Sequence, residues 1–199
     1  MTDIWWSTPL YEFLRRCDLS GLDKRVLDCG AGGKEPPLWL FSQNGYTTCG
    51  IDIQWEAVAK AKQFCQDRDV TLNIFLGDMR HIPFADACFQ FVYAFNAIFF
   101  MTKTDIAVAM AEIERVLKPG GLCYVNFMSV DDPDRRPFGE DAYARRLLGS
   151  EVFAQHQDHE ADGYFASFQI RRKEKRIEEK LVGEHWLKQA YIEYIAQKA

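Results

Sequence analysis

The sequence is 199 residues long, 48% hydrophobic and 14% aromatic, so we expect one folded domain with a substantial core and exclude a disordered chain. A formal charge of −5 gives no overall positive field, and nucleic acid binding would need a local basic patch. Six cysteines form no CxxC pair, and no segment approaches the roughly 18 apolar residues of a membrane span. We therefore expect reduced thiols, a cytoplasmic location and no membrane partner.

Predicted helices and strands alternate over the first two thirds of the chain. Apolar residues at helical spacing predict helices at residues 8–19, 38–43, 56–66 and 102–117. Short apolar or β-branched runs predict strands at residues 25–29, 47–53, 71–76, 89–95 and 122–128. Thr102, three residues before Asp105, predicts the N-cap of the fourth helix. This alternation is typical of βαβ units, which form a mainly parallel sheet with helices on both faces.

The last third of the chain follows a different pattern. Residues 129–168 hold nine acidic residues against four arginines and predict an irregular or helical insertion. Residues 169–182 and 186–198 predict two long strands of an antiparallel hairpin. The stretch HQDHE (156–160) fits neither HExxH nor HxxEH spacing, so we expect no metal site. The stretch RRKEKR (171–176) alternates between two faces of a strand and predicts a solvated sheet edge.

Acidic side chains follow three of the predicted strands. Asp28, Gly30 and Gly32 come at the end of the first strand, Asp52 ends the second, and Asp78 follows the third. Ligands of open parallel sheets bind beyond the carboxyl ends of the strands, so these residues should share one rim. Negative charge disfavours a pyrophosphate there, but carboxylates accept bonds from ribose hydroxyls and pair with cations. The rim therefore suits a ligand with a sugar and a positive charge.

S-adenosylmethionine has this profile, because it carries a ribose diol, an ammonium and a sulfonium but no phosphate. The stretches VLDCGAGGKEPPL, GIDI, GDMRHIPF and RVLKPGGLCYVNF occur in that order within residues 24–128. They resemble the motifs of the class I S-adenosylmethionine-dependent methyltransferases of the small-molecule, type 11/25-like kind. The resemblance implies an α/β, Rossmann-like fold: a seven-stranded, mainly parallel sheet sandwiched by helices, with an antiparallel last strand.

The resemblance also implies roles for the rim residues. Gly30 and Gly32 would let the turn approach the methionine part of the cofactor, and Asp28 would support its ammonium. Asp52 would hold the ribose hydroxyls. One departure is Lys34, which stands where many members carry the third glycine of G-x-G-x-G.

Further positions are implied for the adenine and the methyl group. Ile53 and Met79 would pack on the two adenine faces, and Asp78 would accept from the adenine amino group. Phe95 and Asn96, which follow the fourth strand, would face the methyl group and the acceptor.

Polar groups that could assist catalysis are few. Asn96, Tyr11 and His81 are the candidates near the rim. Trp5, Trp6 and Tyr11 predict an aromatic lid within residues 1–24, although packing against the body is the alternative. None of these side chains is a required nucleophile, because methyl transfer is an in-line displacement that depends mainly on orientation.

The expected function is methyl transfer to a small-molecule acceptor, cationic or amine-bearing if the acidic insertion faces it. We expect one methyltransferase domain over residues 1–199, and a homodimer is left open. The alternatives are an RNA or protein methyltransferase and a non-catalytic binder of the same cofactor. An NAD-dependent dehydrogenase is more distant, because Glu35 occupies the last glycine position of G-x-G-x-x-G.

Overall fold

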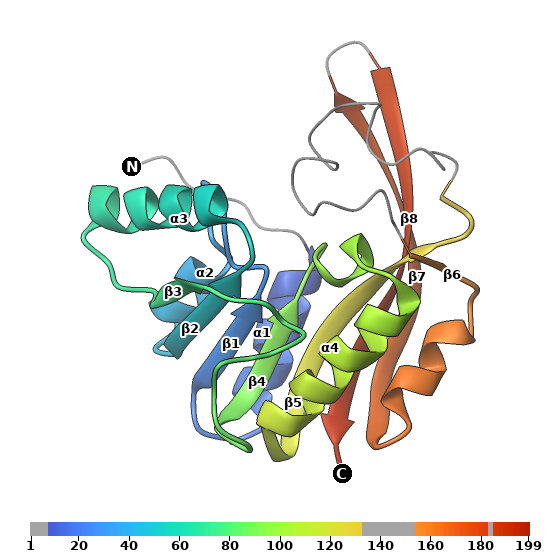
Figure 1. The fold of residues 1–199 in the computed structure, drawn as a ribbon, viewed down its shortest axis with the longest axis horizontal. Coiled ribbons are helices and arrows are strands. Elements are labelled where there is room, and N and C mark those ends of the chain that lie inside the picture. The colour runs from blue at the N-terminus through green and yellow to red at the C-terminus, as the bar shows by residue number, and fades with distance from the viewer. Residues whose placement is uncertain (1–7, 133–153, 183–184) are drawn as a thin grey trace.

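A computed structural model describes residues 8–132, 154–182 and 185–199 (Figure 1). The chain first forms α1 (Thr8–Leu19), β1 (Arg25–Cys29), α2 (Leu38–Gln43), β2 (Thr47–Asp52), α3 (Trp55–Arg68) and β3 (Ile74–Leu76). It continues with β4 (Phe89–Ala94), the 3₁₀ helix η1 (Ile98–Phe100), α4 (Lys103–Val116) and β5 (Leu117–Ser129). The last elements are β6 (Gln155–His156), the 3₁₀ helix η2 (Glu160–Phe165), β7 (Phe168–Val182) and β8 (His185–Lys198).

The strands form one sheet in the order β3-β2-β1-β4-β5-β8-β7. Strands β1 to β5 run parallel to one another, and β8 is antiparallel to both β5 and β7. This arrangement confirms the expected mainly parallel sheet with an antiparallel last strand. The two-residue β6, which pairs with the end of β5, adds an eighth strand to the expected seven.

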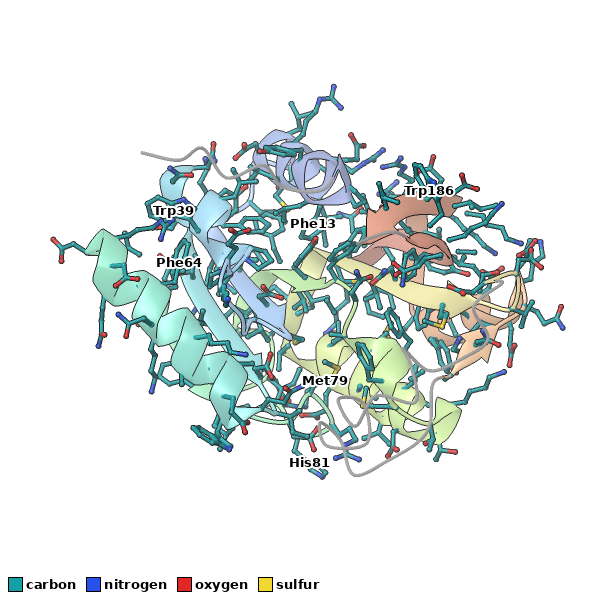
Figure 2. The ribbon with its side chains drawn as sticks, turned by 90° about the horizontal axis from the view of Figure 1, so that it is seen from above. Phe13, Trp39, Phe64, Met79, His81 and Trp186 are labelled. Atoms are coloured by element: carbon teal, nitrogen blue, oxygen red, sulfur yellow. The ribbon has the colours of Figure 1, made fainter. Side chains whose placement is uncertain are left out.

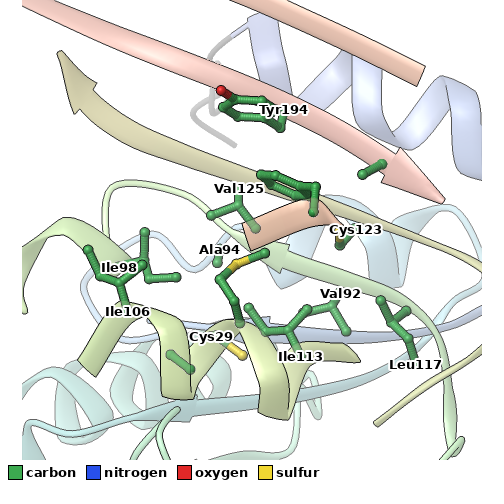
Figure 3. Close-up of a cluster of buried hydrophobic side chains, with 14 of the residues drawn as sticks. Cys29, Val92, Ala94, Ile98, Ile106, Ile113, Leu117, Cys123, Val125 and Tyr194 are labelled. Atoms are coloured by element: carbon green, nitrogen blue, oxygen red, sulfur yellow. The ribbon is translucent and has the colours of Figure 1, made fainter. Parts of the chain in front are cut away.

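Helices cover both faces of the sheet (Figure 1). On one face, α4 packs against the central strands through Ile106 and Ile113, which meet Cys29, Val92 and Ala94 of β1 and β4 (Figure 3). These side chains are all fully buried. Because β1 and β4 are covered on both faces, burial is continuous along them from Val26 to Cys29 and from Phe89 to Ala94 rather than alternating.

The opposite face is covered by α1, α2 and α3 and is rich in aromatic rings. Phe13 of α1 stacks on Tyr93 of β4, with 5.8 Å between ring centroids, and lies 6.2 Å from Phe41 of α2. Tyr124 of β5 continues this group, at 5.1 Å from Tyr93. Helix α1 therefore contributes to the core through its apolar stripe, as its helical spacing predicts.

The starts of β3 and β5 differ most from the sequence prediction. Strand β3 begins at Ile74 rather than residue 71, because Asn73 has a positive φ of 53° that ends the extended backbone. Strand β5 begins at Leu117, directly after α4, and its ladder with β4 shifts register between Phe89 and Phe91. The expected N-cap is confirmed, since Thr102 Oγ1 accepts the backbone N–H of Asp105 at 3.0 Å.

The hairpin of β7 and β8 extends beyond the body of the sheet at one end (Figure 1). Much of the expected insertion, residues 133–153, lies outside the described residues, as do Trp5 and Trp6 of the expected lid. In the described part of the chain, no helix is long and apolar enough to cross a membrane.

Candidate functional site

A pocket of about 380 Å³ opens where β1, β2, β3 and β4 end. This edge includes the switch point of the sheet. Strand β1 lies between β2 and β4, and the chain crosses from β3 at one side of β1 to β4 at the other. The start of α4 and the segment before it close the far wall. The lining residues are Gly30, Ile51, Asp52, Ile53, Gln54, Gly77, Asp78, Met79, Arg80, Asn96, Ala97, Phe100, Met101, Thr102 and Asp105.

The glycine turn after β1 is packed too closely for side chains. Gly30 has a φ of 100°, and a Cβ atom there would lie 2.6 Å from Cβ of Ala97. A Cβ atom on Gly32 would lie 2.4 Å from Cβ of Ala57 and 2.6 Å from Oδ2 of Asp52. Glycine at these two positions therefore lets the turn lie against the ends of the neighbouring segments and presents bare backbone beside the pocket.

The carboxylate of Asp52 is fixed by two backbone donors at the end of β2. Its Oδ2 accepts the N–H of Gly32 at 2.9 Å, and its Oδ1 accepts the N–H of Gln54 at 2.9 Å. Burial raises the pKa of Asp52, and the two backbone hydrogen bonds oppose that effect. Each carboxylate oxygen has a second lone pair, so the group can still accept from two hydroxyls of a ligand.

Asp28 lies behind the rim and is 2% exposed. Its Oδ2 is buried and has no hydrogen-bond partner among the described residues. Burial raises the pKa of Asp28 well above its ordinary value, and the negative charge of Asp52 adds to the effect. A buried carboxyl oxygen without a donor is costly, so the site favours a ligand that brings a donor or a positive charge.

Asp78, on the loop after β3, forms a salt bridge with Arg80. The Nε of Arg80 lies 3.1 Å and 3.0 Å from the two carboxylate oxygens, and its Nη2 lies 2.6 Å from Oδ2. The Nη1 of Arg80 reaches Asp105 of α4 at 3.4 Å. The hydrogen bonds from Arg80 hold the pKa of Asp78 below its ordinary range. Arg80 therefore ties one wall of the pocket to the other.

Asn96 follows β4 in a left-handed conformation, with a φ of 51°. Its backbone N–H and its side-chain oxygen both pair with the side chain of Asn126 on β5. Ala97, Phe100 and Met101 continue the wall beside it and make that side of the pocket apolar. The pocket thus has carboxylates toward β2 and β3 and an amide with apolar groups toward β4 and α4.

The structure brings together most of the site residues expected from the sequence. The expected residues that line the pocket are Gly30, Asp52, Ile53, Asp78, Met79 and Asn96. Gly32 is joined to this set through its hydrogen bond to Asp52. Sequence reasoning missed Arg80 and Asp105, and only the position of Arg80 two residues after Asp78 could have suggested their contact.

Other expected residues lie elsewhere. Phe95 stacks on Tyr93, with 6.1 Å between centroids, and belongs to the aromatic group on the α1 face. Tyr11 is 40% exposed on α1. His81 and Lys34 are exposed, and Figure 2 shows His81 farther out than Met79. Among the described residues, the lining of this pocket includes none of these four, and it does not include the buried Asp28, so the functional roles of these five residues stay predictions.

Fold and site together define a Rossmann-like protein with a nucleoside-type pocket: a glycine turn after the first strand and a fixed carboxylate after the second. Residues 27–125, about half of the chain, match the family model described as a methyltransferase domain.

Known proteins agree with this class. The chain is 33% identical over 114 residues to methyltransferase GfsG from Streptomyces halstedii, covering 56% of this chain and 39% of that protein. It is 30% identical over 133 residues to 27-O-demethylrifamycin SV methyltransferase from Amycolatopsis mediterranei, covering 65% and 47%. Its fold resembles a SAM-dependent methyltransferase from Methanosarcina mazei, with a TM-score of 0.67 and 19% identity over 98% of this chain and 99% of that one.

Residues 27–125 of this chain therefore belong to this methyltransferase-domain family. The alignments with the two curated relatives span less than half of those proteins' length.

Proposed function

We propose that this chain transfers the methyl group of S-adenosylmethionine to a small-molecule acceptor. The observation that carries the proposal is the carboxylate of Asp52, which two backbone N–H groups hold at the pocket rim. A carboxylate fixed in this way can accept both hydroxyls of a ribose without reorganising.

The other pocket residues fit the remaining parts of the cofactor. Ile53 and Met79 offer apolar surfaces for the adenine ring, and Asp78 offers an acceptor for its amino group. The buried oxygen of Asp28, which has no described donor, fits the positively charged ammonium of the methionine part. The lack of side chains at Gly30 and Gly32 leaves room for that part along the turn.

The bound cofactor supplies an electrophilic methyl group on a sulfonium. The chain's own contribution is to hold the acceptor in line and to exclude water. Orientation of this kind contributes on the order of 7–11 kcal/mol in well-aligned reactions. Phe100 and Met101 provide an apolar wall for this purpose, and Asn96 is the polar group beside them.

A small acceptor is favoured over nucleic acid because four basic residues of β7 are already ion-paired, and a fifth, Arg171, donates to Gln197. Binding to a phosphate backbone draws on free Lys and Arg side chains along a surface. In β7, the ion pairs are Arg172 with Glu174 and Glu12, Lys173 with Asp162, Lys175 with Asp131 and Asp158, and Arg176 with Glu178 and Glu193. One relative, moreover, is named for a small molecule, 27-O-demethylrifamycin SV.

The proposal is tested first by calorimetric titration with S-adenosylhomocysteine. Loss of a charge-assisted hydrogen bond costs about 1.5–3 kcal/mol, so we expect Asp52→Asn to weaken binding by roughly tenfold or more. The control is Asp67→Asn, which removes an exposed carboxylate on α3 that accepts from Gln63. Equal affinities of wild type and Asp52→Asn would contradict the ribose assignment.

The second test is turnover with S-adenosyl-[methyl-³H]methionine. We expect label to enter small organic acceptors. Strong labelling of RNA or of protein substrates with none of small molecules would contradict the proposed acceptor class. Tight cofactor binding without label transfer to small molecules, RNA or protein would indicate a non-catalytic binder.

A further inference from the structure

A buried amide lies behind the pocket wall formed by Asn96. Asn126 is 0% exposed and stands between Val125 and Phe127 in the middle of the long strand β5. A buried amide must satisfy its donors and acceptor within the protein, and a polar residue in an otherwise apolar strand needs a specific partner. Asn96 provides that partner from the neighbouring strand end.

Two hydrogen bonds join the two asparagines. The backbone N–H of Asn96 donates to Oδ1 of Asn126 at 2.7 Å, and Nδ2 of Asn126 donates to Oδ1 of Asn96 at 2.6 Å. A backbone N–H can only donate, so the Asn126 atom that faces it must be the oxygen. The other amide atom of Asn126 is then the nitrogen, which requires an oxygen opposite. The orientation of both amides therefore follows from one backbone N–H.

This orientation decides what Asn96 can offer to a ligand. Its side-chain oxygen accepts a hydrogen bond from Nδ2 of the buried Asn126. The Nδ2 of Asn96 has no acceptor among the described residues. Asn96 lines the pocket together with Ala97 and Gly30. The left-handed backbone, with a φ of 51°, keeps the residue in this position, and Asn tolerates that conformation better than most residues do. Toward the pocket, Asn96 is thus a donor.

We propose that Asn126 is a positioning residue that locks Asn96 with its N–H groups toward the pocket, and that these donate to an accepting atom of the methyl acceptor. The inference rests on the proposed function and narrows its substrate class. The acceptor carries a carbonyl oxygen, a phenolate oxygen or a ring nitrogen beside the atom that is methylated. A simple amine presents N–H donors, which the N–H groups of Asn96 cannot pair with.

Two isosteric substitutions change the polarity of this group. In Asn126→Asp, a carboxylate faces both the backbone N–H and the side-chain amide of Asn96. The side-chain amide of Asn96 then has lower energy when its N–H groups point toward the carboxylate. The carbonyl oxygen of Asn96 then faces the pocket. In Asn96→Asp, the bond from Asn126 Nδ2 is kept and a carboxylate oxygen replaces the donor. The second variant buries no new charge behind the wall, so it still tests the proposal if the first fails to fold.

The matched control is Asn73→Asp. Asn73 also has a positive φ, of 53°, and its Nδ2 donates to the carbonyl of Thr48 at 3.0 Å. It does not line the pocket. The control therefore reports the general cost of replacing a left-handed, hydrogen-bonded asparagine by aspartate.

The experiment measures methyl transfer to four probes and affinity for S-adenosylhomocysteine. The probes 2′-hydroxyacetophenone and 2-hydroxy-1,4-naphthoquinone carry a carbonyl beside the hydroxyl, whereas benzylamine and 2-phenylethylamine present only an amine. We expect wild type and Asn73→Asp to methylate the carbonyl probes. Asn126→Asp and Asn96→Asp should lose about tenfold or more in kcat/KM for them, with S-adenosylhomocysteine affinity within about twofold of wild type.

The ratio between probe classes separates positioning from general damage, because a merely structural loss lowers both classes alike. The two variants should shift the ratio toward the amines. Preference of wild type for the amines, absence of turnover on both carbonyl probes, or an unchanged ratio in the variants would overturn the proposal. A loss of S-adenosylhomocysteine affinity equal to the loss of turnover would also overturn it, because Asn96 would then serve the cofactor. Failure of wild type to bind S-adenosylhomocysteine would instead contradict the proposed function.

Discussion

The carboxylate of Asp52 lies 2.9 Å from the backbone nitrogen of Gly32 and accepts its N–H. This bond joins the end of β2 to the glycine turn after β1, two segments that are 20 residues apart in sequence. The positions of the Asp52 carboxylate, which we propose to bind the ribose, and of the Gly32 backbone are therefore coupled. Changing either residue should disturb both.

Gly32→Ala should weaken binding of S-adenosylhomocysteine by roughly tenfold or more, comparable to loss of a charged hydrogen bond. The new Cβ would lie 2.6 Å from Oδ2 of Asp52 and 2.4 Å from Cβ of Ala57, so the carboxylate must move. Calorimetric titration measures the change. Gly163→Ala serves as control, since no atom lies within 4 Å of a Cβ there, and its affinity should match wild type. Tight binding by Gly32→Ala would show that the turn does not set the position of Asp52.

Thr102→Ala should lower the free energy of unfolding by about 1 kcal/mol, the usual cost of losing a side-chain N-cap. The hydroxyl of Thr102 accepts the N–H of Asp105 at 3.0 Å at the start of α4. Urea denaturation measures the change. Thr104→Ala, a substitution of an exposed residue two positions later in α4, should leave the free energy of unfolding unchanged. Equal losses in the two variants would contradict the capping role.

Arg115→Lys should lower the free energy of unfolding by about 2 kcal/mol, because lysine cannot reproduce the guanidinium fork. Arg115 of α4 donates to the carbonyls of Ile82 and Phe84 at 2.9 Å and 2.8 Å and is paired with Glu112 at 2.7 Å. These bonds attach the loop after β3 to α4. Hydrogen exchange should show faster opening of residues 77–88. The exposed Arg15→Lys on α1 is the control, and faster exchange in both variants would contradict the proposed anchor.

Stability should fall on acidification through His156. This side chain is fully buried, its Nε2 contacts the Tyr164 hydroxyl at 3.2 Å, and its ring packs on Phe127. Burial, helped by the positive charge of Lys103, lowers the pKa of His156. Below about pH 6.5 the unfolded chain takes up a proton that the folded chain does not, so the free energy of unfolding decreases as pH falls.

The variant His156→Phe cannot take up this proton. Denaturant titrations between about pH 7.5 and 5 should therefore give it a shallower decline in unfolding free energy than wild type. Identical slopes in wild type and His156→Phe would show that another group controls the acid response.

Local patterns in the sequence predict most of the fold. The bounds of α1, β1 and α2 agree with the expected ranges, because each is a short apolar pattern ended by turn residues. The start of β3 could not be predicted, since the left-handed backbone of Asn73 follows from its side-chain bond to the carbonyl of Thr48, 25 residues away in sequence. A contact of that kind leaves no periodic signal.

The site is predictable to a similar degree. Strand ends place Asp52, Asp78 and Met79 on one rim, since carboxyl ends of parallel strands meet at one edge. The expected position of Phe95 near the methyl group has less support, because Phe95 follows β4 directly and stacks on Tyr93, on the α1 face of the sheet. The fork between Arg80 and Asp78 depends on rotamers, which spacing alone does not determine.

The most direct test of the central claim compares two ligands in one calorimeter. The claim is that Asp52 at the pocket rim holds a ribose, and that the buried Asp28 behind it favours a positively charged group over a phosphate. Titration of the wild-type chain with S-adenosylmethionine and with NAD, in the same buffer, should give saturable binding for the first and none for the second. Saturable binding of NAD with no heat from S-adenosylmethionine would contradict the account.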